Sequence, residues 1–126
     1  MALAHFSLVV IDCPDPLSLA AFYSSLTGLE IEPQDDVAPD DVTGADLMNG
    51  DHPTIHFQKV EQYVAPTWPD GPIPQQFHID FEVEDLDTAE QHALAIGATK
   101  AAGEPGGKFR VFLDPVGHPF CLCKWS

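Results

Sequence analysis

The sequence predicts an α+β protein built from two βαβββ modules, and three observations support this prediction. Several segments alternate between apolar and polar residues, which is typical of half-buried strands. In each half of the chain, one such segment precedes a run with helical periodicity that begins near an aspartate and ends at a glycine. A proline-rich connector at residues 62–76 separates the halves. We therefore expect a single domain, residues 1–126, with module 1 at about 1–61 and module 2 at about 77–126.

The first strand and helix of module 1 are predicted from periodicity and capping residues. Residues 5–10 alternate, and we expect the more apolar face to pack against the helix. That face carries Phe6, Leu8 and Val10. Asp15 followed by Pro16 predicts the start of the helix, and Gly28 predicts its end.

The rest of module 1 consists of an acidic segment and a further strand. Residues 30–51 contain eight carboxylates and no lysine or arginine, which predicts short or edge strands joined by solvated loops. Residues 54–60 alternate again. We expect Ile55 and Phe57 to be buried, with the polar side chains between them on the other face.

Module 2 repeats this order of elements. Residues 77–84 alternate as a strand, and Asp87 with Glu90 three residues later predicts a capping box at the start of a helix. Gly97 predicts the end of that helix. Two further strands are expected at residues 109–113 and 120–125.

The two modules also align residue by residue, as expected for an internal repeat. The opening strands align at an offset of 73, the helix ends at 69 and the last strands at 65. The aligned pairs are His5 with His78, Asp12 with Asp85, Gly28 with Gly97, and His56 with Cys121. This alignment indicates that both halves share one fold.

The composition excludes several classes of partner. Twenty acidic residues against five basic ones give a net charge of −15, which repels phosphate backbones and anionic lipids. No apolar run approaches the roughly 20 residues that span a bilayer. The three cysteines are an odd number, and we expect thiols in a reducing compartment. These observations predict a cytoplasmic protein that binds neither nucleic acid nor membranes.

The order and spacing of several short motifs resemble a known superfamily. The motifs are His5 in the opening strand, the helix ends at Gly28 and Gly97, the run from His78 to Asp85, and Asp-Pro-Val-Gly at 114–117. Together they are similar to the glyoxalase, bleomycin-resistance and extradiol-dioxygenase superfamily, also called the vicinal oxygen chelate proteins. The resemblance covers nearly the whole chain, and within the superfamily the chain looks most like glyoxalase-like proteins whose reaction is unassigned.

This resemblance implies a fold, a class of ligand and a metal site. It implies a homodimer whose subunits have two curved mixed sheets around a cleft. Superfamily members typically bind a divalent metal through the first and last strands of each module, and the equivalent residues here are His5, His56, His78 and Cys121. Cys121 stands where the superfamily ordinarily has a glutamate. Mg²⁺, Mn²⁺ and Fe²⁺ lose an oxygen ligand there, whereas imidazoles and a thiolate suit zinc.

The residues themselves leave other roles open. The histidines also suit ordinary polar positions on strands, and Cys121 suits a small buried hydrophobe, so no cofactor is assigned. Ser7, Gln58, Asp80 and Arg110 are candidates for substrate binding. Asp80 also suits a general base or a solvated carboxylate. Arg110, the only arginine, suits either a substrate carboxylate or a nearby aspartate.

Three functions are compatible with these features. The first is a glyoxalase-like protein that binds a small organic molecule in the cleft and carries out lyase- or isomerase-type chemistry. The sequence leaves open whether this chemistry depends on a metal. The second is a non-catalytic drug- or metabolite-binding protein of the bleomycin-resistance type, for which the acidic charge favours cationic ligands. The third is a metal-dependent lyase or dioxygenase. A fold alone does not select among them.

Overall fold

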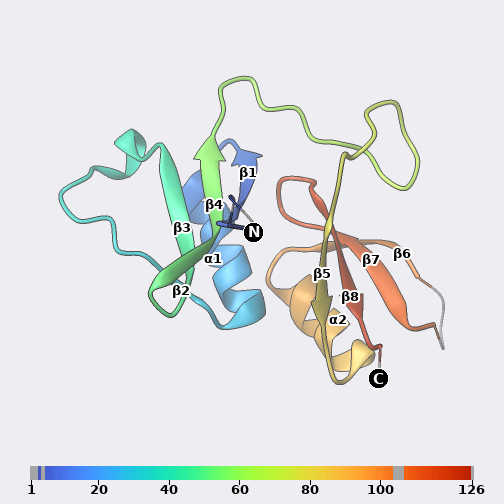
Figure 1. Ribbon diagram of the computed structural model, residues 1–126. Helices are drawn as coiled ribbons and strands as arrows, with labels where there is room; N and C mark the ends of the chain where they lie inside the picture. Colours follow the sequence, from blue (N-terminus) through green and yellow to red (C-terminus); the bar gives the residue numbers. More distant parts are fainter. Residues whose placement is uncertain (1–2, 4, 104–106, 126) are drawn as a thin grey trace. The chain divides into compact units, whose positions relative to one another are not determined.

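Each half of the chain folds into a βαβββ unit with its own four-stranded sheet (Figure 1). The computed structural model describes residues 3, 5–103 and 107–125. The chain divides into unit 1, Met1–Tyr63, and unit 2, Val64–Ser126. The elements are β1 (Val9–Cys13), α1 (Pro16–Thr27), β2 (Glu30–Ile31), the 3₁₀ helix η1 (Pro39–Asp41), β3 (Gly44–Asn49), β4 (His52–Lys59), β5 (Ile79–Glu82), α2 (Leu86–Ala95), β6 (Thr99–Ala102), β7 (Phe109–Leu113) and β8 (Pro119–Cys123). The predicted α+β class with two βαβββ modules is confirmed.

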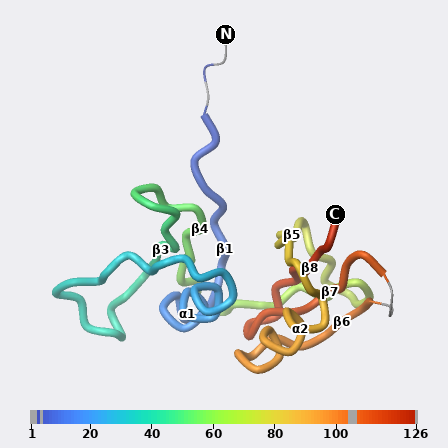
Figure 2. Tube along the Cα trace, turned by 90° about the horizontal axis from the view of Figure 1, so that it is seen from below, coloured from blue at the N-terminus to red at the C-terminus, as the bar shows by residue number. Residues whose placement is uncertain are grey.

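Unit 1 is built on a mixed sheet with the strand order β1-β4-β3-β2. β1 runs parallel to β4, and the other neighbours are antiparallel. Helix α1 packs against β3 and β4 (Figure 2). Between helix and sheet, Tyr23 stacks on Phe57 with ring centroids 5.6 Å apart. Leu19 and Leu47 are also fully buried there, so the core of unit 1 lies under its helix.

Unit 2 has the same topology, with the strand order β5-β8-β7-β6 and β5 parallel to β8. Helix α2 packs against β8 and β6 (Figure 2). Phe112 stacks on Phe120 with ring centroids 5.7 Å apart, and both rings are fully buried. All five residues of β8 are buried, so both faces of this central strand are covered.

The first strand buries the opposite face from the one predicted. Ile11 and Cys13 are buried, whereas Val10 is 45% exposed and Phe6, ahead of the strand, is 83% exposed. The parallel pairing with β4 sets this face, because Ile11 lies opposite the buried Phe57. The expectation that the face of Phe6 and Val10 packs on the helix is therefore wrong.

The offset between the two opening strands is 70 residues rather than the predicted 73. Asp15 and Asp85 are the N-caps of α1 and α2, and they are 70 residues apart. The predicted match of Asp12 with Asp85 is wrong. A shift of three residues exchanges the two faces of a strand, because side chains alternate with a period of two. The corrected alignment therefore agrees with the burial of Ile11 and Cys13 on the helix side of β1.

Strand pairing supports the corrected alignment. The equivalent pairs in the two sheets are Val10 with His56 in unit 1 and Asp80 with Cys121 in unit 2. On this alignment Leu8, rather than His5, corresponds to His78. The predicted equivalence of the two histidines is therefore not supported by the structure.

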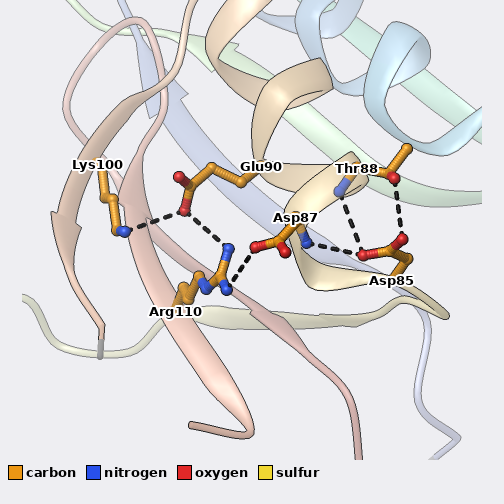
Figure 3. Close-up of polar contacts among 6 residues, drawn as sticks. All are labelled: Asp85, Asp87, Thr88, Glu90, Lys100 and Arg110. Atoms are coloured by element: carbon orange, nitrogen blue, oxygen red, sulfur yellow. Dashed lines mark hydrogen bonds and ion pairs between the residues drawn. The ribbon is translucent and has the colours of Figure 1, made fainter. Parts of the chain in front are cut away.

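The predicted capping box on the second helix is also wrong. Asp85 caps α2, and its Oδ1 accepts hydrogen bonds from the backbone N–H groups of Asp87 and Thr88 at 3.0 and 3.4 Å. Thr88 Oγ1 donates a third hydrogen bond to Asp85 Oδ2 at 3.0 Å. Glu90 instead bonds with side chains of the sheet (Figure 3). Asp85 is the residue directly before the first helical residue, Leu86, so it and not Asp87 occupies the N-cap position.

The acidic segment contains one strand that the sequence did not predict correctly. β2 is short and lies at the edge of its sheet, as expected. β3, however, has six residues and lies between β2 and β4. Ala45 and Leu47 are buried in it, so this part of the segment contributes to the core. Ala45 and Leu47 alternate with less buried residues along β3, but the many carboxylates of the segment concealed this pattern in the sequence.

The connector contributes no strand in the described part of the chain, as its prolines predict. Thr67 and Pro74 form only an isolated bridge. Trp68, from the same segment, packs against the sheet of unit 2. None of the helices that the structure describes is long and apolar enough to cross a membrane.

Candidate functional site

The sheet of unit 2 has a chemically distinctive face opposite its helix. Along β8, side chains alternate between the buried core and this second face. Cys121 and Cys123 cluster there with Val111 of β7. Trp68 and the alanines of β6 pack against the cluster. The two thiols therefore lie under a partial cover of apolar side chains.

Three potential metal ligands converge at this face. His78, Asp80 and Cys121 each offer one donor atom, and these atoms lie within 4.8 Å of one another. His78 Nε2 is 3.3 Å from Asp80 Oδ1. Asp80 on β5 lies directly opposite Cys121 on β8, so the strand pairing itself brings the carboxylate to the thiol. Nitrogen, oxygen and sulfur are the ligand atoms that zinc accepts in proteins.

Both thiols of this face are protonated at neutral pH. Burial, with a smaller contribution from the nearby Asp80 carboxylate, raises the pKa of Cys121 to about 12. Burial also raises the pKa of Cys123, to about 11. A thiol without its thiolate form is a poor nucleophile. A bound cation reverses this preference, because a metal-coordinated thiol loses its proton.

An aromatic ring completes the surroundings of His78. The rings of Trp68 and His78 stack with centroids 4.9 Å apart and planes 23° from parallel. Trp68 also touches the cluster that contains Cys121. This contact fixes one side of the imidazole and places an apolar surface beside the three donor atoms.

Unit 1 carries a different set of polar residues on the corresponding face of its sheet. His56 Nδ1 lies 2.7 Å from Asp46 Oδ1. Gln58 Nε2 donates to Asp12 Oδ1 at 3.3 Å. The predicted polar face of β4 is thus correct, and its residues are held by side-chain partners on β3 and β1.

The four predicted metal ligands are divided between the units. His78 and Cys121 lie together in unit 2, with Asp80 as the third donor. His5 is exposed ahead of β1, and His56 is paired with Asp46 in unit 1. Asp80 was predicted as a substrate-binding residue rather than a ligand. Its place two residues after His78 on an extended segment puts the two side chains on one face, and this spacing was the signal for a shared metal site.

The predicted substrate-binding residues also separate. Arg110 lies on the helix face of its sheet, where its guanidinium contacts Asp87 Oδ1 at 2.8 Å and Glu90 Oε1 at 3.2 Å (Figure 3). Its side chain is only 11% exposed, and its hydrogen bond with Asp87 raises its pKa. Of the two roles that the sequence left open for Arg110, the structure therefore supports the local carboxylate partner.

Ser7 and Gln58 remain exposed in unit 1. Ser7 lies before β1, and its backbone carbonyl accepts a hydrogen bond from His52 Nε2 at 2.8 Å. Gln58 is on β4 beside Asp12. Their contacts are compatible with ligand binding but do not single it out.

The duplicated βαβββ topology and its strand order define a vicinal oxygen chelate fold. The profile of the glyoxalase-like domain family matches residues 8–123, and the chain therefore belongs to this family. No curated protein sequence matches the chain. The resemblance predicted from the sequence motifs is confirmed.

Several solved structures share this fold. A glyoxalase/bleomycin resistance protein/dioxygenase family enzyme from Burkholderia phytofirmans PsJN is 20% identical, with a TM-score of 0.71 and coverage of 98% of this chain and 100% of that one. The fosfomycin resistance protein FosX from Mesorhizobium loti is 15% identical, with a TM-score of 0.72 and coverage of 99% and 94%. The oxidase ChaP-H2 is 18% identical, with a TM-score of 0.66 and coverage of 99% and 96%. At these identities the similarity shows the fold alone.

Proposed function

We propose that the chain binds a small organic molecule at the face of unit 2 that carries His78, Asp80 and Cys121, with zinc as the preferred metal. The convergence of these three donor atoms within 4.8 Å is the observation that carries the proposal. Membership of the glyoxalase-like family supports small-molecule binding. Fosfomycin resistance and oxidase activity are properties of the structurally similar proteins, and the proposal does not depend on them.

The donor set fits zinc better than an oxygen-preferring ion. One imidazole, one carboxylate and one thiolate provide three ligands, and catalytic zinc sites use three protein ligands with a fourth position for water or substrate. Mg²⁺ and Mn²⁺ prefer carboxylate, carbonyl and water oxygens, of which this cluster offers only Asp80. When bound, zinc would supply a Lewis acid that polarises an oxygen of the small molecule.

The surrounding residues support ligand binding beside the metal. Trp68 provides an apolar ring next to His78 and orients the imidazole by stacking. Small-molecule sites typically combine such an apolar surface with a few converging polar groups. A flat, partly apolar molecule with a metal-binding oxygen matches this combination.

A melting series on chelator-treated protein tests the metal. A ligand present at 100 times its dissociation constant adds about 2.7 kcal/mol to the free energy of unfolding, which corresponds to several degrees in melting temperature. We expect Zn²⁺ to raise the melting temperature, with much smaller effects of Mg²⁺, Mn²⁺ and Fe²⁺. The shift should disappear in His78→Ala and Cys121→Ser.

Matched controls lie on the same two strands. Cys123→Ser changes a buried thiol two residues along β8, and Glu82→Gln changes a carboxylate two residues along β5. Both variants should retain the zinc shift, whereas Asp80→Asn should weaken it. If Cys121→Ser and Cys123→Ser reduced the zinc-induced rise in melting temperature equally, the result would contradict a specific zinc site at Cys121. A large rise in melting temperature with Mn²⁺ or Fe²⁺ would instead favour a metal-dependent lyase or dioxygenase, which is the third function that the sequence allows.

A non-catalytic binder is the second candidate function. The exposed aspartates around η1 favour it, because an acidic surface attracts cationic drugs or metabolites. A panel of cationic compounds that binds equally well with and without metal would support this function.

The homodimer and the cytoplasmic location remain expectations from the sequence. Light scattering on the purified chain measures its oligomeric state and so tests the homodimer.

A further inference from the structure

A carboxylate and an imidazole form a close pair on the open face of unit 1. Asp46 on β3 and His56 on β4 are directly opposed in the antiparallel pairing. Their Oδ1 and Nδ1 atoms are 2.7 Å apart, and each side chain is 33% exposed. The pair is therefore accessible, yet its two partners hold one another in place.

The backbone beneath the pair is shaped to accept the imidazole. A Cβ atom added at Gly44 would lie 2.6 Å from His56 Cε1 and 2.8 Å from Nε2. Gly44 is two residues before Asp46 on the same strand, so it lies diagonally across from His56. Any larger residue there would push the ring away. Gly44 thus has a steric role, and the ring has one defined position.

This geometry determines which nitrogen of His56 carries the proton in its neutral form. An ionised carboxylate only accepts hydrogen bonds, so the contact with Asp46 requires a proton on Nδ1. Nε2 of the neutral imidazole then keeps its lone pair. Among the residues that the structure describes, none makes a hydrogen bond with Nε2 of His56.

We propose that His56 is a general base and that Asp46 is its positioning residue. The base accepts a proton at Nε2 from an O–H, S–H or acidic C–H group of a small molecule bound on this face. In that step the X–H bond breaks, an N–H bond forms at Nε2, and the electron pair stays on the ligand. Asp46 stabilises the resulting imidazolium, as carboxylates do in carboxylate–imidazole pairs generally.

Other groups on this face are compatible with that role. Asp12 and Gln58 form a second polar pair beside His56, which offers hydrogen bonds to the same ligand. Val10, opposite His56 on β1, is 45% exposed and provides an apolar contact. The site uses residues of unit 1 alone and does not require the proposed metal of unit 2, so the two proposals fail independently.

The test measures the tautomer and the reactivity of His56 in the full chain. In nitrogen-15 NMR spectra, the neutral form of the His56 ring should carry its proton on Nδ1. Diethyl pyrocarbonate, an electrophile that acylates unprotonated imidazole nitrogens, should modify His56 at Nε2. Asp46→Ala should produce a mixture of tautomers and of acylated nitrogens, and Gly44→Ala should do the same by displacing the ring.

Asp35→Asn is the control, because it removes an exposed carboxylate of unit 1 that lies outside the proposed site, and it should leave both measurements of His56 unchanged. Amide spectra of each variant verify that it is folded. A proton on Nε2 in the wild-type protein would overturn the proposal. So would an unmodified His56 under conditions that acylate the exposed His5, or a tautomer that is unaffected by Asp46→Ala.

Discussion

Arg110 shows how its neighbours give a single side chain its role. It is the only arginine in a chain of net charge −15, and it lies on the helix face of β7. Asp87 and Glu90 of α2 both contact its guanidinium, and Lys100 contacts Glu90 at 3.1 Å (Figure 3). The network therefore joins the helix to two strands of unit 2, and Arg110 is its best-buried member.

Removal of Arg110 should destabilise the protein more than removal of Lys100. Arg110→Met leaves Glu90, whose side chain is only 21% exposed, without its buried cation. We expect a melting temperature lower by roughly 10 °C. Lys100 is 39% exposed, and Lys100→Met should lower the melting temperature by no more than roughly 3 °C. Equal effects in thermal unfolding would contradict a special role of the arginine.

The two thiols of β8 predict a loss of stability at alkaline pH. Their pKa values are raised from 9.0 to about 12 for Cys121 and about 11 for Cys123. Above pH 9 the unfolded chain loses these protons before the folded chain does, so the free energy of unfolding falls as the pH rises. The maximum slope is about 1.4 kcal/mol per pH unit for each thiol.

Urea unfolding at pH 8, 9, 10 and 10.5 measures this slope. The contribution of the thiols is fully present below pH 9 and is lost as the pH rises toward 11 and 12. A Cys121→Ala/Cys123→Ala variant should show a shallower decline than the wild-type protein. Parallel declines would mean that lysines and tyrosines account for the whole effect.

The residue identities of the candidate site were more predictable than its grouping. His78 and Cys121 were predicted as metal ligands of a kind that suits zinc, whereas Asp80 was predicted to bind substrate. The resemblance implied a common metal site for His78 and Cys121, but the place of Asp80 in it was not predictable, because it depends on the register between β5 and β8. The role of Arg110 was left open because residues 109–113 are apolar on both sides, so alternation did not reveal the helix face.

At the scale of elements, both helices were predicted because their ends carry local signals, although the N-cap of α2 is Asp85 and not Asp87. Asp15 and Gly28 delimit α1 as expected. The faces of the strands were less predictable, because β1 has apolar residues on both sides and only the pairing with β4 selects one. The same limit explains why β3 was mistaken for an edge or loop segment.

The N-cap of α2 should be more important to stability than that of α1. Asp85 accepts three hydrogen bonds, from two backbone N–H groups and Thr88 Oγ1, whereas Asp15 accepts one, from Ser18 N at 3.3 Å. Asp85→Ala should therefore lower the melting temperature more than Asp15→Ala. Differential scanning calorimetry of the two variants compares them directly, and the opposite ranking would contradict this assignment.

The pH dependence of Asp85 provides a second measurement. Its hydrogen bonds with Thr88 and Asp87 lower its pKa from the ordinary 3.8. A lowered pKa stabilises the folded state above about pH 4. That stabilisation is lost as the pH falls through the folded-state pKa. Asp85→Asn should therefore flatten the acid limb of the stability profile, which urea unfolding between pH 3 and pH 6 measures.

At the scale of the whole molecule, two copies of one topology carry different chemistry. His56 in unit 1 and Cys121 in unit 2 occupy equivalent strand positions. Their carboxylate partners, however, come from different strands: Asp46 from β3 and Asp80 from β5. The fold class, the repeat and the family were predictable, because they depend on the order of elements. The divergence of the two faces was not, because it depends on side-chain partners across strands.

The strong negative charge predicts that salt stabilises the whole protein. With a net charge of −15, the folded chain repels itself, and the range of that repulsion falls from about 30 Å at 0.01 M salt to about 10 Å at 0.1 M. The melting temperature should therefore rise between 10 and roughly 300 mM NaCl. Four exposed aspartates near η1 allow a test: Asp35, Asp36, Asp40 and Asp41.

Replacement of all four by asparagine changes the net charge to −11 and should reduce this salt dependence. Asparagine also tolerates the left-handed backbone of Asp36, whose φ is 63°. At high salt, the free energies of unfolding of the two proteins should agree within about 0.5 kcal/mol. Cationic compounds should bind the variant more weakly at low salt, and the difference should vanish as salt screens the field. An unchanged salt slope would show that the acidic segment does not govern the electrostatics of the molecule.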